Sequence, residues 1–129
     1  MPAFSRRSKT RLESCHKDIQ KVFGGLVKIH DFSVLCGHRS KRMQNDAFNK
    51  RRSQLRYPDS KHNALPSLAI DVAPYPIDWE DRGRFYFLAG AVLMRAAVLD
   101  IRLRWGGDWN GNHRFDDQGF DDLPHFELI

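Results

Sequence analysis

The chain has 129 residues and no apolar run near the ~20 residues needed to span a membrane as a helix. Its first residues, Met1 to Arg7, lack the apolar stretch of a signal peptide, so we expect a protein made in a cytoplasm and not exported by the usual route. Cysteine is scarce: Cys15 and Cys36 stand in no spacing typical of a metal site, and we expect both to be free buried thiols. The absence of internal repeats excludes a repeat architecture and leaves one domain over residues 1–129, expected to be a monomer.

Acidic residues are few in the first half of the chain. Residues 1–61 hold 15 lysines and arginines against 5 acidic residues, a net charge of +10, whereas residues 62–129 hold 6 against 11, a net charge of −5. The basic half could face nucleic acid, a phospholipid surface or an anionic cell-wall polymer, or it could be a solvated face, and charge alone does not choose. The acidic half is the more favourable place for a cation.

Apolar periodicity predicts helices early in the chain and strands later. The expected helices are one from about Thr10, with Glu13 completing a capping box, to about Lys28, one capped by Ser40, and one capped by Asp78 and ending near Leu99. The expected strands are residues 32–36, 68–73, 101–105 and 125–128, with surface loops over 50–59 and 106–121. This order predicts an α+β fold with a small antiparallel sheet and flanking helices.

Asp71 lies inside the apolar strand 68–73, where a carboxylate is costly unless it is paired or bound to a metal. Because strand side chains alternate between faces, Asp71 and His125 can meet if their strands are neighbours. His62, in the loop before the first of these strands, can reach the same place. Two imidazoles and one carboxylate can hold a catalytic zinc ion and leave its fourth position open for water.

A carboxylate beside such a metal can act as general base. Asp122 lies three residues before His125 and is the best placed candidate, with Asp121 and Glu127 as close competitors.

A second cation site is an open alternative in the polar loop 106–121. Asp108, Asn110 and Asn112 alternate as at the start of a calcium-binding loop, although the glycine and the glutamate of an EF-hand are missing. The loop therefore either binds a cation such as calcium or is simply polar.

Several motifs occur in the order typical of one family of zinc peptidases: Gly37-His38-Arg39-Ser40, Ser60-Lys61-His62, Ala69-Ile70-Asp71, Arg104 to Trp109, and Asp122-Leu123-Pro124-His125. They resemble elements of the VanY-like family of D-alanyl-D-alanine carboxypeptidases and dipeptidases and of L-alanyl-D-glutamate endopeptidases used as phage endolysins. The resemblance covers residues 32 to 129 and implies the fold shared by hedgehog and D-Ala-D-Ala peptidases. It also implies zinc bound by His62, Asp71 and His125, with Asp122 as base.

Three residues are candidates for contact with the substrate, and the resemblance supplies the role of the first. Arg39 would steady the carbonyl oxygen as it becomes an oxyanion, and Ser60 belongs to the motif that carries the first histidine. Trp109 either lines a substrate groove or packs in the interior. The chain departs from the family pattern with eight rather than six residues between His62 and Asp71, and with His38 where the family has tyrosine.

These features predict a zinc-dependent peptidoglycan hydrolase that cuts the L-alanyl-D-glutamate bond of the stem peptide, as an endolysin waiting in the host cytoplasm before lysis. A D-alanyl-D-alanine carboxypeptidase is the alternative within the family. A basic metal-dependent nuclease is the alternative from another class, although no stable nucleic-acid partner is expected. A metal-binding relative without catalysis is a further alternative, against which the presence of Asp122 argues.

Overall fold

The computed structural model describes residues 2–129. It contains four α-helices, one short 3₁₀ helix and four strands among these residues. In chain order they are α1 (Arg6–Glu13), α2 (Lys17–Leu26), β1 (Phe32–Cys36), α3 (Lys41–Asn49), η1 (Lys61–Asn63), β2 (Ala69–Pro74), α4 (Arg82–Val98), β3 (Leu103–Trp105) and β4 (His125–Leu128). No helix among the described residues is both long and apolar enough to cross a membrane.

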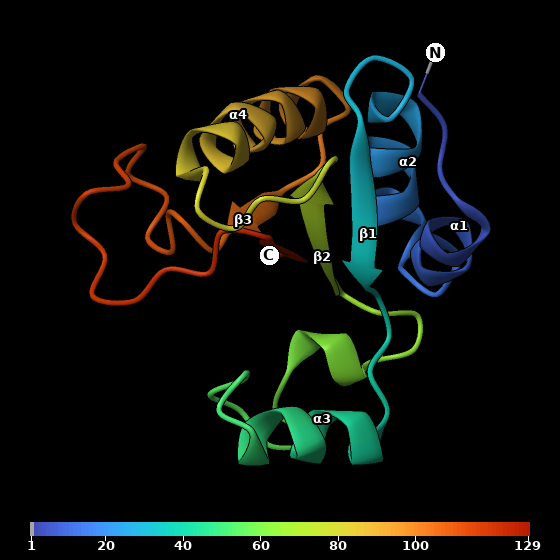
Figure 1. The fold of residues 1–129 in the computed structure, drawn as a ribbon, viewed down its shortest axis with the longest axis vertical. Coiled ribbons are helices and arrows are strands. Elements are labelled where there is room, and N and C mark those ends of the chain that lie inside the picture. The colour runs from blue at the N-terminus through green and yellow to red at the C-terminus, as the bar shows by residue number, and fades with distance from the viewer. Residues whose placement is uncertain (1) are drawn as a thin grey trace.

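The four strands form one antiparallel sheet in the order β1-β2-β4-β3, so the predicted α+β fold is confirmed (Figure 1). The last strand of the chain lies between β2 and β3, and its pairing with β2 sets Asp71 directly opposite His125. In antiparallel sheets, directly opposed residues project from the same face. The sheet register therefore brings two of the predicted site residues together.

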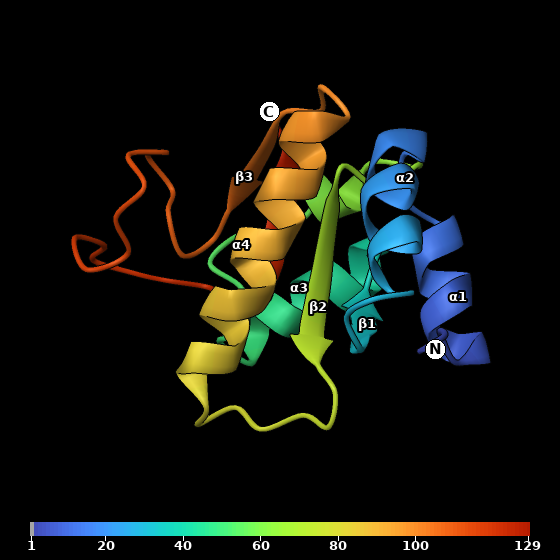
Figure 2. The same ribbon diagram turned by 90° about the horizontal axis from the view of Figure 1, so that it is seen from above.

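The two faces of the sheet have different roles. Ile70, Val72 and Phe126 point into the apolar core, where they pack with side chains of α1, α2 and α4. Figure 2 shows α2 and α4 side by side over this face. Asp71 and His125 alternate with these core residues and so face the other way. There α3 and η1 form a separate small lobe, seen at the bottom of Figure 1.

The predicted helix from Thr10 to Lys28 is wrong, because the chain forms two helices with a break between them. Ser5 caps α1, and His16 caps α2 by accepting a hydrogen bond from the Asp18 amide. At the break, the amide of His16 donates to the carbonyl of Ser67 at 2.8 Å, and the amide of Ser67 donates to the carbonyl of Ser14 at 2.8 Å. This pairing with a segment fifty residues away diverts backbone groups that a continuous helix would use.

Other boundaries differ less. The helix predicted to begin at Asp78 is α4, which begins at Arg82 after Asp81. Asp78 instead accepts a hydrogen bond from the Glu80 amide in a separate turn. Ser40 caps α3 through the Met43 amide, as predicted. All four strands begin and end within two residues of their predicted ranges. Residues 106–121 form no helix or strand, also as predicted.

Candidate metal centre and cleft

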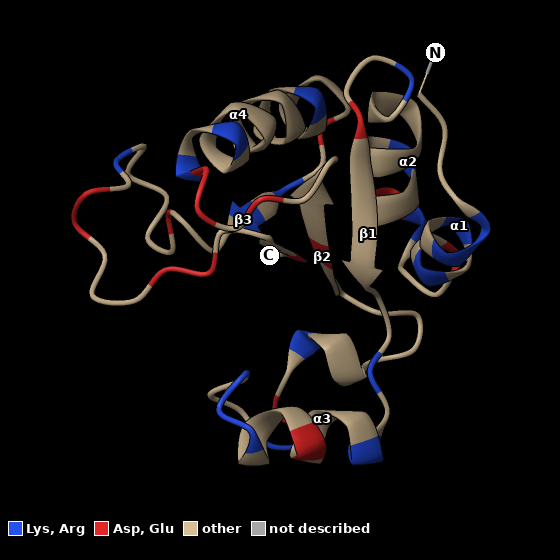
Figure 3. Cartoon of the chain, in the orientation of Figure 1, with Lys and Arg blue, Asp and Glu red and all other residues tan. Residues whose placement is uncertain are grey.

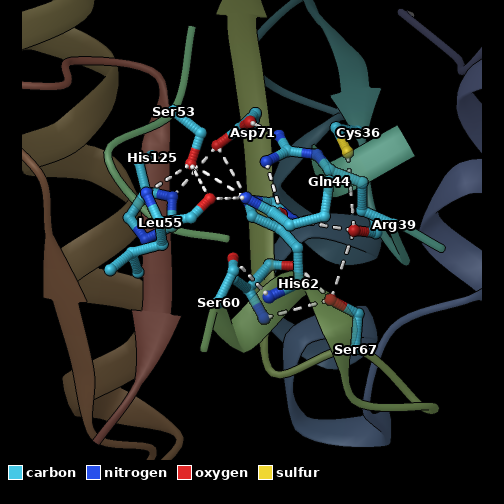
Figure 4. Close-up of polar contacts among 12 residues, drawn as sticks. Cys36, Arg39, Gln44, Ser53, Leu55, Ser60, His62, Ser67, Asp71 and His125 are labelled. Atoms are coloured by element: carbon cyan, nitrogen blue, oxygen red, sulfur yellow. Dashed lines mark hydrogen bonds and ion pairs between the residues drawn. The ribbon is translucent and has the colours of Figure 1, made fainter. Parts of the chain in front are cut away.

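Three side chains from three elements converge beside the sheet (Figure 4). Asp71 projects from β2, His125 from β4 and His62 from η1. Nδ1 of His125 lies 3.1 Å from Oδ1 of Asp71, and Nε2 of His62 lies 3.3 Å from the same oxygen. The predicted grouping of two histidines around one carboxylate is thus present in the structure.

The outer nitrogen of each imidazole is already engaged. Nδ1 of His62 lies 2.7 Å from the carbonyl oxygen of Gly37, which can only accept, so this nitrogen carries a proton. Nε2 of His125 lies 2.8 Å from Oε1 of Glu127 and donates in the same way. In its neutral form each ring therefore turns a lone pair toward Asp71. Nε2 of His62 is buried and has no hydrogen-bond partner among the described residues.

Acceptor atoms that face one another in this way need a positive charge between them, and the titration of the three groups reflects it. Burial alone would lower the pKa of His62, but the Asp71 carboxylate outweighs burial and raises this pKa to about 10. The pKa of His125 rises to about 9 because Asp71 and Glu127 likewise outweigh burial. Burial would raise the pKa of Asp71, yet the two imidazoles hold it well below its usual range. The Asp71 carboxylate thus favours positive charge at this site, whether as protons on the imidazoles or as a bound cation.

Asp122 lies next to this group. One carboxylate oxygen of Asp122, one of Asp71 and one ring nitrogen of His125 all lie within 4.8 Å of one another. Burial, and then the charge of Asp71, raise the pKa of Asp122. The competing carboxylates are occupied: Asp121 pairs with Arg82 on the surface, and Glu127 accepts from His125. Of the three candidate bases, Asp122 alone faces the cluster without a side-chain partner among residues 2–129.

Arg39 approaches the same centre from the segment between β1 and α3. One guanidinium nitrogen lies 3.4 Å from Oδ2 of Asp71, and another donates to Oε1 of Gln44 at 3.0 Å. Gln44 is fully buried, accepts from Asn63 on η1 and donates to the carbonyl of Leu55 (Figure 4). Gln44 was not among the predicted site residues. Its neighbour Met43 is 54% exposed, so the apolar pattern of the helix gave no sign that Gln44 is buried.

Cys36 was also missed as a neighbour of the site. A bulge between Val34 and Cys36 shifts the register of β1, so that Cys36 rather than Leu35 pairs with Asp71. The Cys36 sulfur, one ring nitrogen of His62 and one carboxylate oxygen of Asp71 all lie within 4.8 Å of one another. Burial would raise the pKa of this thiol, but His62 outweighs it and the pKa is lowered. Cys15 is buried, as predicted, whereas Cys36 is half-buried, and both are free.

The cluster opens into a cleft of about 1060 Å³. Arg39, Ser60 and Trp109 all line it, and their contact with a substrate stays a prediction. The Ser60 hydroxyl accepts from the amide of His62 at 3.2 Å and so also caps the turn that carries this histidine. The Trp109 ring lies 5.5 Å from that of His125. Residues 52–55 of the predicted surface loop 50–59 also line the cleft.

In the polar loop 106–121, residues near its start are hydrogen-bonded to one another. The Asp108 carboxylate accepts from the amides of Asn112 and His113 at 3.2 and 2.9 Å, and Asn110 also accepts from the Asn112 amide. Calcium binding by Asp108, Asn110 and Asn112 stays a prediction.

Comparison with known proteins identifies the family. Residues 2–129 match the family model described as phage L-alanyl-D-glutamate peptidase. The chain is 31% identical over 134 residues to the L-alanyl-D-glutamate peptidase of Escherichia phage T5, covering 98% of this chain and 97% of that protein. The crystal structure of the Serratia marcescens L-Ala D-Glu endopeptidase ChiX is similar with a TM-score of 0.77 and 28% identity, over 99% of this chain and 91% of that one. The chain therefore belongs to the phage L-alanyl-D-glutamate peptidase family.

Proposed function

We propose that this protein is a zinc-dependent endopeptidase that cuts the bond between L-alanine and D-glutamate in the stem peptide of peptidoglycan. Family membership supports the substrate and the class of reaction. The observation that carries the metal assignment is the convergence of one nitrogen of each imidazole on the same oxygen of Asp71, with Nε2 of His62 buried and without a hydrogen-bond partner among the described residues. A buried polar atom in this condition is costly, and bound metal would remove the cost.

The donor set suits zinc. His62, Asp71 and His125 supply the nitrogen and oxygen donors that a catalytic zinc site uses, and leave one position for water. When bound, zinc lowers the pKa of that water to near neutrality and polarises the peptide carbonyl.

Asp122 is the proposed general base. Its raised pKa brings it closer to neutral pH, where a base both accepts and returns a proton efficiently. In this role it takes the proton of the attacking water and gives it to the nitrogen of the leaving D-glutamate.

Arg39 supplies a positive charge at the edge of the same cluster. Its guanidinium would stabilise the carbonyl oxygen as negative charge develops on it. Ser60 and Trp109 also line the cleft and would contact the stem peptide.

A D-alanyl-D-alanine carboxypeptidase is the second candidate, because it needs a cation for the terminal carboxylate and Arg52 lines the cleft. The nuclease alternative is disfavoured, since the cleft wall also carries Asp59, Asp117 and Glu127, which would repel phosphates.

The charge distribution suits an enzyme of cell envelopes. Lysine and arginine residues are frequent on α1 and around α3, while acidic residues follow one another along the loop after β3 (Figure 3). The basic surface would attract anionic envelope polymers. We place the protein in the host cytoplasm before lysis and on the cell wall afterwards.

Digestion of purified peptidoglycan tests the bond. Mass spectrometry of the released fragments should find new N-terminal D-glutamate amines, and DNA and RNA should stay intact. Free D-alanine as the sole product would move the assignment to the carboxypeptidase, and cleavage of nucleic acid alone would move it to the nuclease.

Elemental analysis tests the metal. The wild type should carry about one zinc per chain, as a single tetrahedral site requires. His125→Ala should lose it, and undiminished zinc in this variant would remove His125 from the ligand set.

A further inference from the structure

Glu127 is a buried carboxylate next to the cluster that the proposed reaction does not use. It lies two residues after His125 on β4, so both side chains project from the same face of the sheet. Only 9% of Glu127 is exposed. Oε1 accepts from Nε2 of His125 at 2.8 Å, while Oε2 lies 3.2 Å from Nζ of Lys61 and 3.5 Å from Arg104.

The contact with His125 selects one tautomer of the ring. A carboxylate oxygen accepts hydrogen bonds, so a neutral His125 keeps its proton on Nε2 and its lone pair on Nδ1. Nδ1 is the nitrogen that lies 3.1 Å from Asp71. The opposite tautomer would set an Nε2 lone pair against the Glu127 carboxylate and would turn its N–H toward the cluster.

The contact with Lys61 reaches the other histidine. Lys61 immediately precedes His62 on η1, and its ammonium also donates to the carbonyl of Leu128 on β4. The Lys61 carbonyl in turn accepts from the Leu68 amide at 3.1 Å. Glu127 therefore connects the turn that carries His62 to the strand that carries His125.

We propose that Glu127 is a positioning residue that fixes the His125 tautomer, ties η1 to β4, and so sets the affinity of the site for its metal. The inference rests on the proposed zinc site. Carboxylates that accept the outer N–H of a ligating histidine orient the ring and raise its basicity. Glu127 is not placed to act as base, because one oxygen is engaged by His125 and the other by two cationic side chains.

The test measures zinc affinity of the purified full-length chain by competition with a chromophoric chelator. Glu127→Ala should weaken zinc binding by roughly 10- to 100-fold, the usual effect of losing such a partner. Glu127→Gln keeps an acceptor oxygen for Nε2 of His125 and should recover part of the loss. Arg104→Gln is the matched control, because it removes only the longer, half-exposed ion pair and should change the affinity by less than about threefold.

Long-range ¹H–¹⁵N spectra of the histidine rings supply the second measurement, which a purely structural role would not alter. In the metal-free protein, at a pH above the pKa of His125, the wild type and Glu127→Gln should show a neutral His125 protonated at Nε2, whereas Glu127→Ala should show a mixture of tautomers. Wild-type affinity in both folded variants would overturn the inference while leaving the zinc site intact. A wild-type chain that binds no zinc would overturn the proposed function and this inference together.

Discussion

Replacing Gln44 with leucine should loosen the small lobe and displace Arg39, although Gln44 touches no predicted ligand. Its amide nitrogen donates to Ser53 at 2.9 Å and to the Leu55 carbonyl at 2.6 Å. Its oxygen accepts from Arg39 at 3.0 Å and from Asn63 at 3.2 Å. Leucine fills a similar volume but makes none of these bonds, so the variant isolates the polar contribution.

The magnitude follows from the four bonds. At about 1 kcal/mol each they contribute about 4 kcal/mol. Water can reach two of the abandoned partners, since Ser53 is half-buried and Leu55 is exposed, and the leucine side chain adds apolar burial. We therefore expect Gln44→Leu to lower the free energy of unfolding by about 2–3 kcal/mol.

Urea unfolding at fixed zinc concentration measures this loss, and turnover of peptidoglycan fragments measures the effect on Arg39. Because Arg39 loses its anchor, kcat should fall in the fraction that remains folded. Met43→Leu is the control, since this neighbour on the same helix is exposed and should shift stability by at most about 0.5 kcal/mol. A loss below about 1 kcal/mol with unchanged kcat would refute the reasoning.

Four further outcomes are expected. Asp122→Asn should keep its zinc but lose roughly 10²-fold or more in kcat, and near-normal turnover would transfer the role of base to another carboxylate. Because Asp122 acts as base only when ionised and its pKa is raised, activity should decline with falling pH through a midpoint above the ordinary aspartate value of about 3.9, as a pH–rate profile can show. Burial raises the pKa of Cys15 to about 12, so iodoacetamide at pH 8 should spare this thiol in the folded protein and modify it in urea, as peptide mapping would detect. Phe126→Ala should destabilise the fold by about 3–5 kcal/mol in urea titration, because the ring is fully buried against Phe23 and Trp105.

Local pattern was enough to predict the parts of the molecule that depend on nearby residues. Alternation in the strands correctly predicted that Asp71 and His125 can meet on one face of the sheet, while their neighbours Ile70 and Phe126 pack in the core on the other. An aspartate among apolar residues also marked β2 as unusual, because a buried carboxylate needs a partner. The motif order supplied His62, whose position in a short turn has no periodic signal.

The missed features depend on contacts between distant segments. The break between α1 and α2 requires Ser67, and no local signal at Cys15 indicates it. The bulge at Cys36 becomes visible only when the register with β2 is known. Gln44 looks like an ordinary surface residue of a helix until α3 is packed over the loop before η1.

The site thus combines two kinds of support. Asp71 and His125 are fixed by adjacent positions in the sheet, so their separation depends on the main core. His62 and Arg39 come from segments outside the sheet, and the polar bonds of Gln44 and the Glu127–Lys61 ion pair hold those segments in place. Polar networks of this kind lose several contacts when one member is removed. Substitutions in them should therefore disturb metal affinity and turnover before they unfold the sheet, whereas core substitutions should lower stability first.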